Sequence, residues 1–95
     1  MKKIQINLSM NITFLLMNKS CFEEALKELE SIENVLKEEK AYEQLGVYYI
    51  RKALCLNKLN QEGNHWIEKG KLLLSAIEDI DLLERVGLEI EKRNN

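Results

Sequence analysis

The feature that most constrains the fold of this chain is a helical-hairpin pattern that occurs twice, about forty residues apart. In each copy, small and apolar residues recur at spacings of three and four along two consecutive segments, as they do on one face of a helix. The first copy contains Thr13, Leu16, Phe22, Ala25 and Leu29, and the second contains Ala53, Leu56, Trp66, Ile67 and Gly70. One hairpin cannot bury its own apolar face, whereas stacked hairpins can, and they leave an open concave surface. The pattern therefore predicts a binding scaffold, not a catalyst.

The spacing of apolar residues predicts an all-α chain of about five helices in a single domain over residues 1–95. We expect these helices near residues 3–18, 22–36, 41–59, 66–77 and 83–90, with a frayed end after residue 90. The short connections predict antiparallel hairpins stacked as a short superhelix. The first segment also alternates like a strand from Ile4 to Met10, but a helix is preferred because no partner strand is visible. Its inward residues are expected to be Leu8, Ile12, Leu15 and Leu16.

Three helix starts carry polar residues that favour capping. Ser20 and Glu23 form a capping box, which can satisfy two backbone N–H groups at the start of the second helix. Asn64 is a candidate cap for the fourth helix, and Asp81 with Glu84 repeats the box before the fifth. Gly46 lies inside the third helix, where close approach of a neighbouring helix is one reason for a glycine.

Composition excludes several classes of function. The net charge of −2 gives no basic footprint for nucleic acid or an anionic membrane, and the longest apolar run is too short for a membrane span. Cys21 and Cys55 lack metal or redox spacing and are expected to be free, reduced thiols, which favours a cytoplasmic protein.

The residue types needed for catalysis are scarce. The single histidine, His65, has no second ligand candidate beside it, and the glutamates lie on faces expected to be solvated. The chain has no phosphate-binding glycine loop and no zinc-protease motif. We therefore expect no enzyme activity, no metal site and no cofactor.

The hairpin pattern resembles the tetratricopeptide repeat. That family places a small residue at the eighth position of the repeat and an apolar one at the eleventh, and it opens the second helix with an aromatic and a small residue. Thr13, Leu16, Phe22 and Ala25 match this pattern, within the run CFEEALKEL. The second copy departs in its second helix, where Trp66 occupies the place of a small residue.

A narrower resemblance covers nearly all of the chain. The stretches YYIRKALCLNKLN and WIEKGKLLL, with the closing LLERV, resemble the C-terminal end of Rgg- and PlcR-type bacterial transcription regulators. In that family a C-terminal repeat domain binds a short signalling peptide and forms a homodimer, and an N-terminal helix-turn-helix binds DNA. The resemblance implies that this chain is either the regulatory part of a larger regulator or a truncated stand-alone relative. In the larger regulator, contact with DNA would come only through a domain that this chain lacks.

The same resemblance implies a peptide-binding groove. In peptide-binding repeats the sixth position of the first helix faces the concave groove, and Asn11 and Arg51 occupy that position in the two copies. An asparagine amide can donate to and accept from a peptide bond, whereas an arginine suits a carboxylate. Further groove residues in this register are Met10, Phe14, Met17, Asn18, Asn57 and Lys58. Four of these residues have a plainer explanation: the methionines fit a core, Asn11 fits a bond within its own helix, and Arg51 fits a solvated surface.

Two other hypotheses remain open alongside the peptide-responsive regulator. The chain fits a generic repeat module that binds a protein partner without a signalling peptide. It also fits a purely structural helical piece whose exposed ends pair. Self-association is expected under all three, because an uncapped face of a helical stack needs cover.

Overall fold

The structure is a computed structural model, and it describes residues 2–94. Its five helices are α1 (Lys2–Asn18), α2 (Phe22–Glu38), α3 (Tyr42–Lys58), α4 (Asn64–Ala76) and α5 (Ile80–Asn94). The predicted all-α fold of about five helices is confirmed, and no strand occurs among the described residues. The fifth helix is longer than expected, since it continues through the segment predicted to fray.

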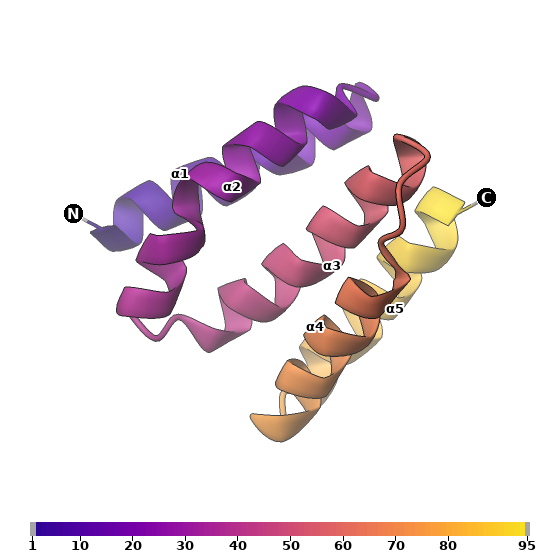
Figure 1. The fold of residues 1–95 in the computed structure, drawn as a ribbon. Helices are drawn as coiled ribbons and strands as arrows, with labels where there is room; N and C mark the ends of the chain where they lie inside the picture. Colours follow the sequence, from indigo (N-terminus) through magenta and orange to yellow (C-terminus); the bar gives the residue numbers. More distant parts are fainter. Residues whose placement is uncertain (1, 95) are drawn as a thin grey trace.

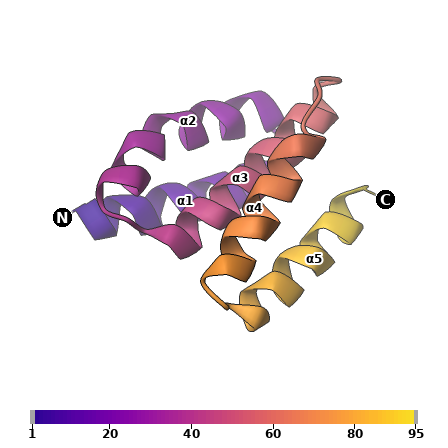
Figure 2. The same cartoon turned by 60° about the horizontal axis from the view of Figure 1, so that its bottom comes forward.

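Helix α3 is the centre of the fold. Consecutive helices pack against each other, and α3 also contacts α1 and α5, so that it meets all four of its neighbours. Figures 1 and 2 show the α1–α2 pair on one side of α3 and the α4–α5 pair on the other. This position explains why α3 buries residues on more than one of its sides. Its buried residues are Leu45, Gly46, Tyr48, Tyr49, Ile50, Ala53, Leu54 and Cys55.

All four connections between helices stop the preceding helix in the same way. The residue after each C-cap has a left-handed backbone, with φ of 61° at Ser20, 53° at Lys40, 62° at Asn60 and 60° at Glu78. The amide after it reaches back to the carbonyl of a leucine, five residues earlier, which is the hydrogen bond of a Schellman motif. The donor–acceptor pairs are Cys21–Leu16, Ala41–Leu36, Gln61–Leu56 and Asp79–Leu74.

The predicted N-caps differ from the observed ones. Ser20 is the left-handed residue of the first connection, Cys21 precedes α2, and no side chain caps that helix. Likewise Gly63 precedes α4 without a side-chain cap, so Asn64 is already helical. At α5 the cap is Asp79, whose Oδ1 accepts a hydrogen bond from the Leu82 amide at 3.1 Å. Of the predicted caps, Ser20 ends the preceding helix, whereas Asn64 and Asp81 already lie within α4 and α5.

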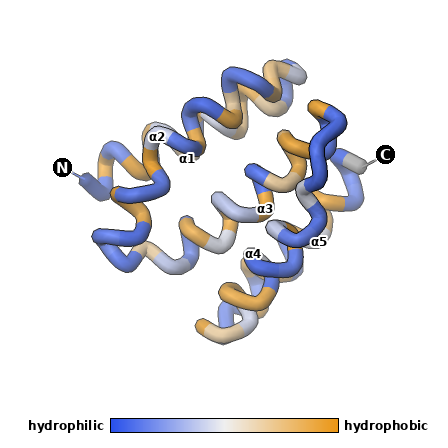
Figure 3. The backbone as a smooth tube through the Cα atoms, in the orientation of Figure 1, coloured by the Kyte–Doolittle hydropathy of each residue, from blue (hydrophilic) through white to orange (hydrophobic). Residues whose placement is uncertain are grey.

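The inward face of α1 is also different from the prediction. Leu8 and Leu15 are 59% and 58% exposed, and the buried residues are Ile6, Ser9, Met10, Thr13 and Met17. Apolar residues occur around much of this helix, so periodicity does not select one face. Figure 3 shows hydrophobic and hydrophilic residues alternating along each helix of the fold.

Two glycines let α3 and α4 approach closely. A Cβ on Gly46 would lie 2.6 Å from Leu74 Cδ2, and a Cβ on Gly70 would lie 2.6 Å from Ile50 Cγ1 and 2.8 Å from the Gly46 carbonyl oxygen. The reason suggested for the interior glycine of α3 is therefore confirmed. This contact fixes the second hairpin, on which α5 then packs.

Candidate functional site

Two hollows lie between α1 and α5 and follow one another along these helices. The larger has a volume of about 660 Å³ and the smaller about 240 Å³. We call the two hollows together the groove. The larger is lined by Phe14, Met17, Asn18, Ser20, Phe22, Lys58, Leu88, Glu89, Lys92 and Arg93. The smaller is lined by Met10, Asn11, Glu43, Gln44, Val47, Arg51, Leu82 and Arg85.

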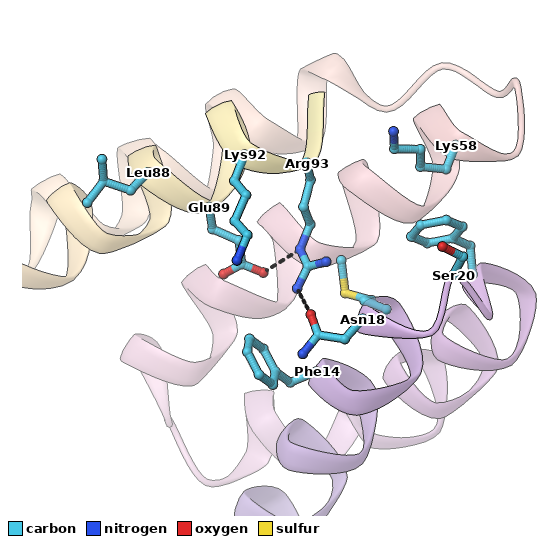
Figure 4. Close-up of a pocket in the computed structure, with 10 residues that line it drawn as sticks. Phe14, Asn18, Ser20, Lys58, Leu88, Glu89, Lys92 and Arg93 are labelled. Atoms are coloured by element: carbon cyan, nitrogen blue, oxygen red, sulfur yellow. Dashed lines mark hydrogen bonds and ion pairs between the residues drawn. The ribbon is translucent and has the colours of Figure 1, made fainter. Parts of the chain in front are cut away.

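Arg93 crosses the larger hollow from α5 to α1. Its Nε donates to Glu89 Oε1 at 3.1 Å, one helical turn away, and its Nη2 donates to Asn18 Oδ1 at 3.0 Å. Figure 4 shows this side chain extending from α5 towards Asn18, with Glu89 beside it. These bonds hold the end of α5, which was expected to fray, against the first helix.

Arg51 lies where the two hollows meet. It projects from the middle of α3, and its side chain is only 14% exposed. Its Nη1 donates to the Met10 carbonyl oxygen at 3.0 Å, while its Nε is buried without a hydrogen-bond partner, 3.6 Å from Glu89 Oε1. Burial lowers the pKa of the Arg51 guanidinium, and the nearby Glu89 carboxylate opposes that shift. An arginine has five N–H donors, and in Arg51 the buried Nε–H is a donor without a hydrogen-bond partner.

Phe14 joins the two arginines across the groove. Its ring is 42% exposed, and its centroid lies 5.4 Å from the Arg51 guanidinium carbon and 5.7 Å from that of Arg93. Both distances are within the range of cation–π attraction. The centre of the groove thus combines an aromatic face with two guanidinium groups.

The groove is basic although the whole chain is acidic. Five basic side chains line the two hollows, against two acidic ones. The net charge of the chain is −2. A cleft lined by one sign of charge concentrates ligands of the opposite sign, so the groove favours an anionic group. The basic residues are Arg51, Lys58, Arg85, Lys92 and Arg93, and the acidic ones are Glu43 and Glu89.

The structure brings most of the candidate residues together. Seven of the eight line the groove, namely Met10, Asn11, Phe14, Met17, Asn18, Arg51 and Lys58. Met10 and Met17 are 8% and 1% exposed, so they form its floor rather than a surface free to adapt to a ligand. The proposal that these residues bind a peptide stays a prediction.

Asn57 lies outside both hollows. Its Oδ1 accepts a hydrogen bond from the Gly63 amide at 3.0 Å, and its Nδ2 donates to Asn64 Oδ1 at 3.1 Å. The side chain therefore closes the connection between α3 and α4. Lys58, the next residue, does line the larger hollow.

Two central residues were missed by sequence reasoning. Glu89 and Arg93 lie on α5, and their place in the groove depends on how that helix packs on α3. Their spacing of four residues is a recognisable helical ion pair, which was the available signal. That signal could show an ion pair but not its position opposite Asn18 and Arg51.

The described residues hold neither a metal-binding cluster nor a membrane-spanning helix. Among residues 2–94, no group of three or more His, Cys, Asp or Glu side chains could hold a metal ion. His65 is exposed beside Trp66, with ring centroids 4.6 Å apart. No helix in this part of the chain has the length and apolar character needed to cross a membrane.

Comparison with known proteins adds no relative. No protein-family model, curated protein or solved structure matches the chain.

Proposed function

We propose that this chain is a non-catalytic regulatory domain that binds a short peptide in the groove between α1 and α5. The observation that carries the proposal is the centre of the groove, where Phe14 lies against two arginines and the buried Nε of Arg51 has no hydrogen-bond partner. Aromatic and apolar residues with a few placed polar groups are typical of ligand sites of this size. Asn11 and Asn18 add amide groups along one wall, where a peptide backbone needs donors and acceptors.

The wider role that we propose follows from the resemblance of the sequence. The domain would be the peptide-responsive, dimer-forming part of a cytoplasmic bacterial transcription regulator of the Rgg and PlcR type. A helix-turn-helix encoded upstream in the same reading frame would support this role. An unrelated gene upstream, with its own stop codon before Met1, would contradict it.

Peptide binding is tested by native mass spectrometry with a pool of synthetic seven-residue peptides. We expect the natural chain to retain a subset of the pool, and Phe14→Ser and Asn11→Ala to retain less of it. Asn34→Ala is the matched control, because Asn34 is an exposed asparagine on α2, which contributes only Phe22 to the groove. Circular dichroism of each variant checks that the helices persist.

Two results would contradict the proposal. The natural chain could retain no peptide, or Phe14→Ser could retain the same peptides as the natural chain. If a folded protein partner bound instead, and Phe14→Ser did not weaken it, the groove would not be the binding surface.

A further inference from the structure

Glu89 occupies a position that a ligand group could take. Its Oε1 atom lies 3.1 Å from Arg93 Nε and 3.6 Å from Arg51 Nε, so a single oxygen faces both guanidinium groups. All three side chains are at most 17% exposed. Two positive charges thus share one negative charge in a place where water screens them little.

We propose that Arg51 and Arg93 form a binding site for a ligand carboxylate, and that Glu89 is an internal competitor for that site. This inference rests on the proposed function, since it names the chemical group that the peptide would place in the groove. A carboxylate has two oxygens, and a guanidinium can bind both through parallel N–H donors. Neither arginine makes such a paired contact with Glu89, because both approach the same oxygen atom.

A carboxylate is the ligand group that fits this site, because the carboxylate of Glu89 already lies between the two arginines. The protein places the carboxylate of Glu89 between these arginines, which shows that the space accepts a group of this shape and charge. Lys58 and Lys92 line the larger hollow together with Arg93 and add positive charge, and Glu89 is the one acidic residue that lines it. A ligand carboxylate would therefore enter a hollow that remains net positive even with Glu89 in place.

Competition of this kind predicts the effect of removing the Glu89 charge. Glu89→Gln keeps the size of the side chain and leaves both guanidinium groups without an internal carboxylate. A ligand carboxylate should then bind more tightly, by about tenfold, because charge-assisted hydrogen bonds are among the strongest in proteins. Arg93→Met in the same background should remove this gain.

The test follows the Arg51 and Arg93 Nε–H signals by nuclear magnetic resonance during titration with three acetylated peptides. The first is acetyl-Phe-Leu with a free C-terminal carboxylate, and the second is the same peptide as its amide. The third, acetyl-Phe-Glu-Leu-amide, carries the carboxylate on a side chain. We expect the two acidic peptides to shift both arginine signals in Glu89→Gln and the amide not to do so. The stronger of the two acidic peptides identifies the source of the carboxylate.

Glu91→Gln is the matched control, because Glu91 is an exposed glutamate on the same helix and should leave the affinity of the natural chain unchanged. Equal shifts of the arginine signals with the acid and amide forms would overturn the inference, as would no shift with either acidic peptide. If the amide peptide instead perturbed only the Phe14 signals, peptide binding in the groove would stand and the carboxylate site would fail.

Discussion

Lys40 shows how a single residue can carry strain without a functional reason. Its φ of 53° lies in the left-handed region, which costs an ordinary side chain about 1–2 kcal/mol relative to the helical region. The Schellman hydrogen bonds from Lys40 and Ala41 compensate for this cost by closing α2. Glycine is the residue that usually fills this position, and none of the four connections has one there.

Lys40→Gly should therefore raise the free energy of unfolding, by up to about 1 kcal/mol after the greater freedom of glycine in the unfolded chain is subtracted. Denaturation by urea measures the difference. Lys27→Gly is the control, since an exposed interior position of α2 should lose about 1 kcal/mol on the same change. A loss of stability in both variants would show that the left-handed position is not strained.

The Glu43 carboxylate lowers the stability of the folded chain, and the size of this effect depends on pH. The Asp79 carboxylate raises the pKa of Glu43 through a shared hydrogen bond and through charge repulsion, and Arg85 opposes this. Because the folded pKa is above the unfolded one, the folded chain is penalised at pH 7. The penalty is relieved as the pH falls through the folded pKa towards the unfolded value, near 4.5.

We therefore expect Glu43→Gln to be more stable than the natural chain at pH 7, with the difference shrinking as the pH approaches 4.5. Urea denaturation at the two pH values measures it. Glu91→Gln, at an exposed position of α5, is the matched control for the substitution itself. A Glu43→Gln variant that equals the natural chain at pH 7 would contradict the expected repulsion.

At the scale of elements, the packing of α4 on α3 depends on two glycines that face each other's helix. The Cβ of an alanine at position 70 would lie 2.8 Å from the Gly46 carbonyl oxygen, and backbone cannot move aside as a side chain end can. Gly87 in α5 is different, because a Cβ there meets nothing within 4 Å. Substitution at Gly70 therefore tests helix packing, whereas substitution at Gly87 tests only the low helix propensity of glycine.

Gly70→Ala should destabilise the chain by about 1–3 kcal/mol, as expected when a packed interface is overfilled. Gly87→Ala should stabilise it by about 0.5–1 kcal/mol, because alanine favours a helix without meeting a neighbour. Thermal unfolding of the two variants beside the natural chain gives the signs. Stabilisation by Gly70→Ala would show that α4 can move away from α3 at little cost.

The elements also show what the sequence could predict. The faces of α2 and α4 were predicted correctly, since each has one apolar stripe: Ala25 and Leu29 of the hairpin pattern are buried in α2, and Ile67 and Gly70 in α4. The buried face of α1 was not predicted, because apolar residues occur on both sides of this helix. Only the packing of α2 and α3 against it decides that Ile6 and Thr13 are buried. In the groove, Asn11 and Arg51 followed from the repeat register. The positions of Glu89 and Arg93 depend on the direction in which the connection between α4 and α5 leads the chain. The periodicity of the sequence does not specify that direction.

At the scale of the whole molecule, the outer face of α1 is an apolar ridge. Ile4, Leu8 and Leu15 recur on the same side of the helix and are 67%, 59% and 58% exposed. Monomeric proteins seldom leave such residues together in water, so the ridge fits the self-association expected of an uncapped helical stack.

Leu8→Glu should weaken self-association at least about tenfold by placing a charge in the middle of this ridge. Sedimentation velocity over a range of protein concentrations measures the change. Leu72→Glu is the matched control, because Leu72 is also a strongly exposed leucine, at 72%, but lies on α4. If Leu72→Glu dissociated the complex and Leu8→Glu did not, the interface would lie at the other end of the molecule.

The position of α5 at the end of the stack determines when this helix unfolds relative to the others. Val86 is the one residue of this helix that is buried among those described, whereas α3 buries eight. Terminal units of a helical stack have a neighbour on one side only and open before the centre does. One wall of the groove is therefore formed by α5, the helix whose backbone amides should exchange with solvent first. A ligand held between α1 and α5 would slow that exchange far from its own contacts, so that binding would be visible as a stiffening of the whole final helix.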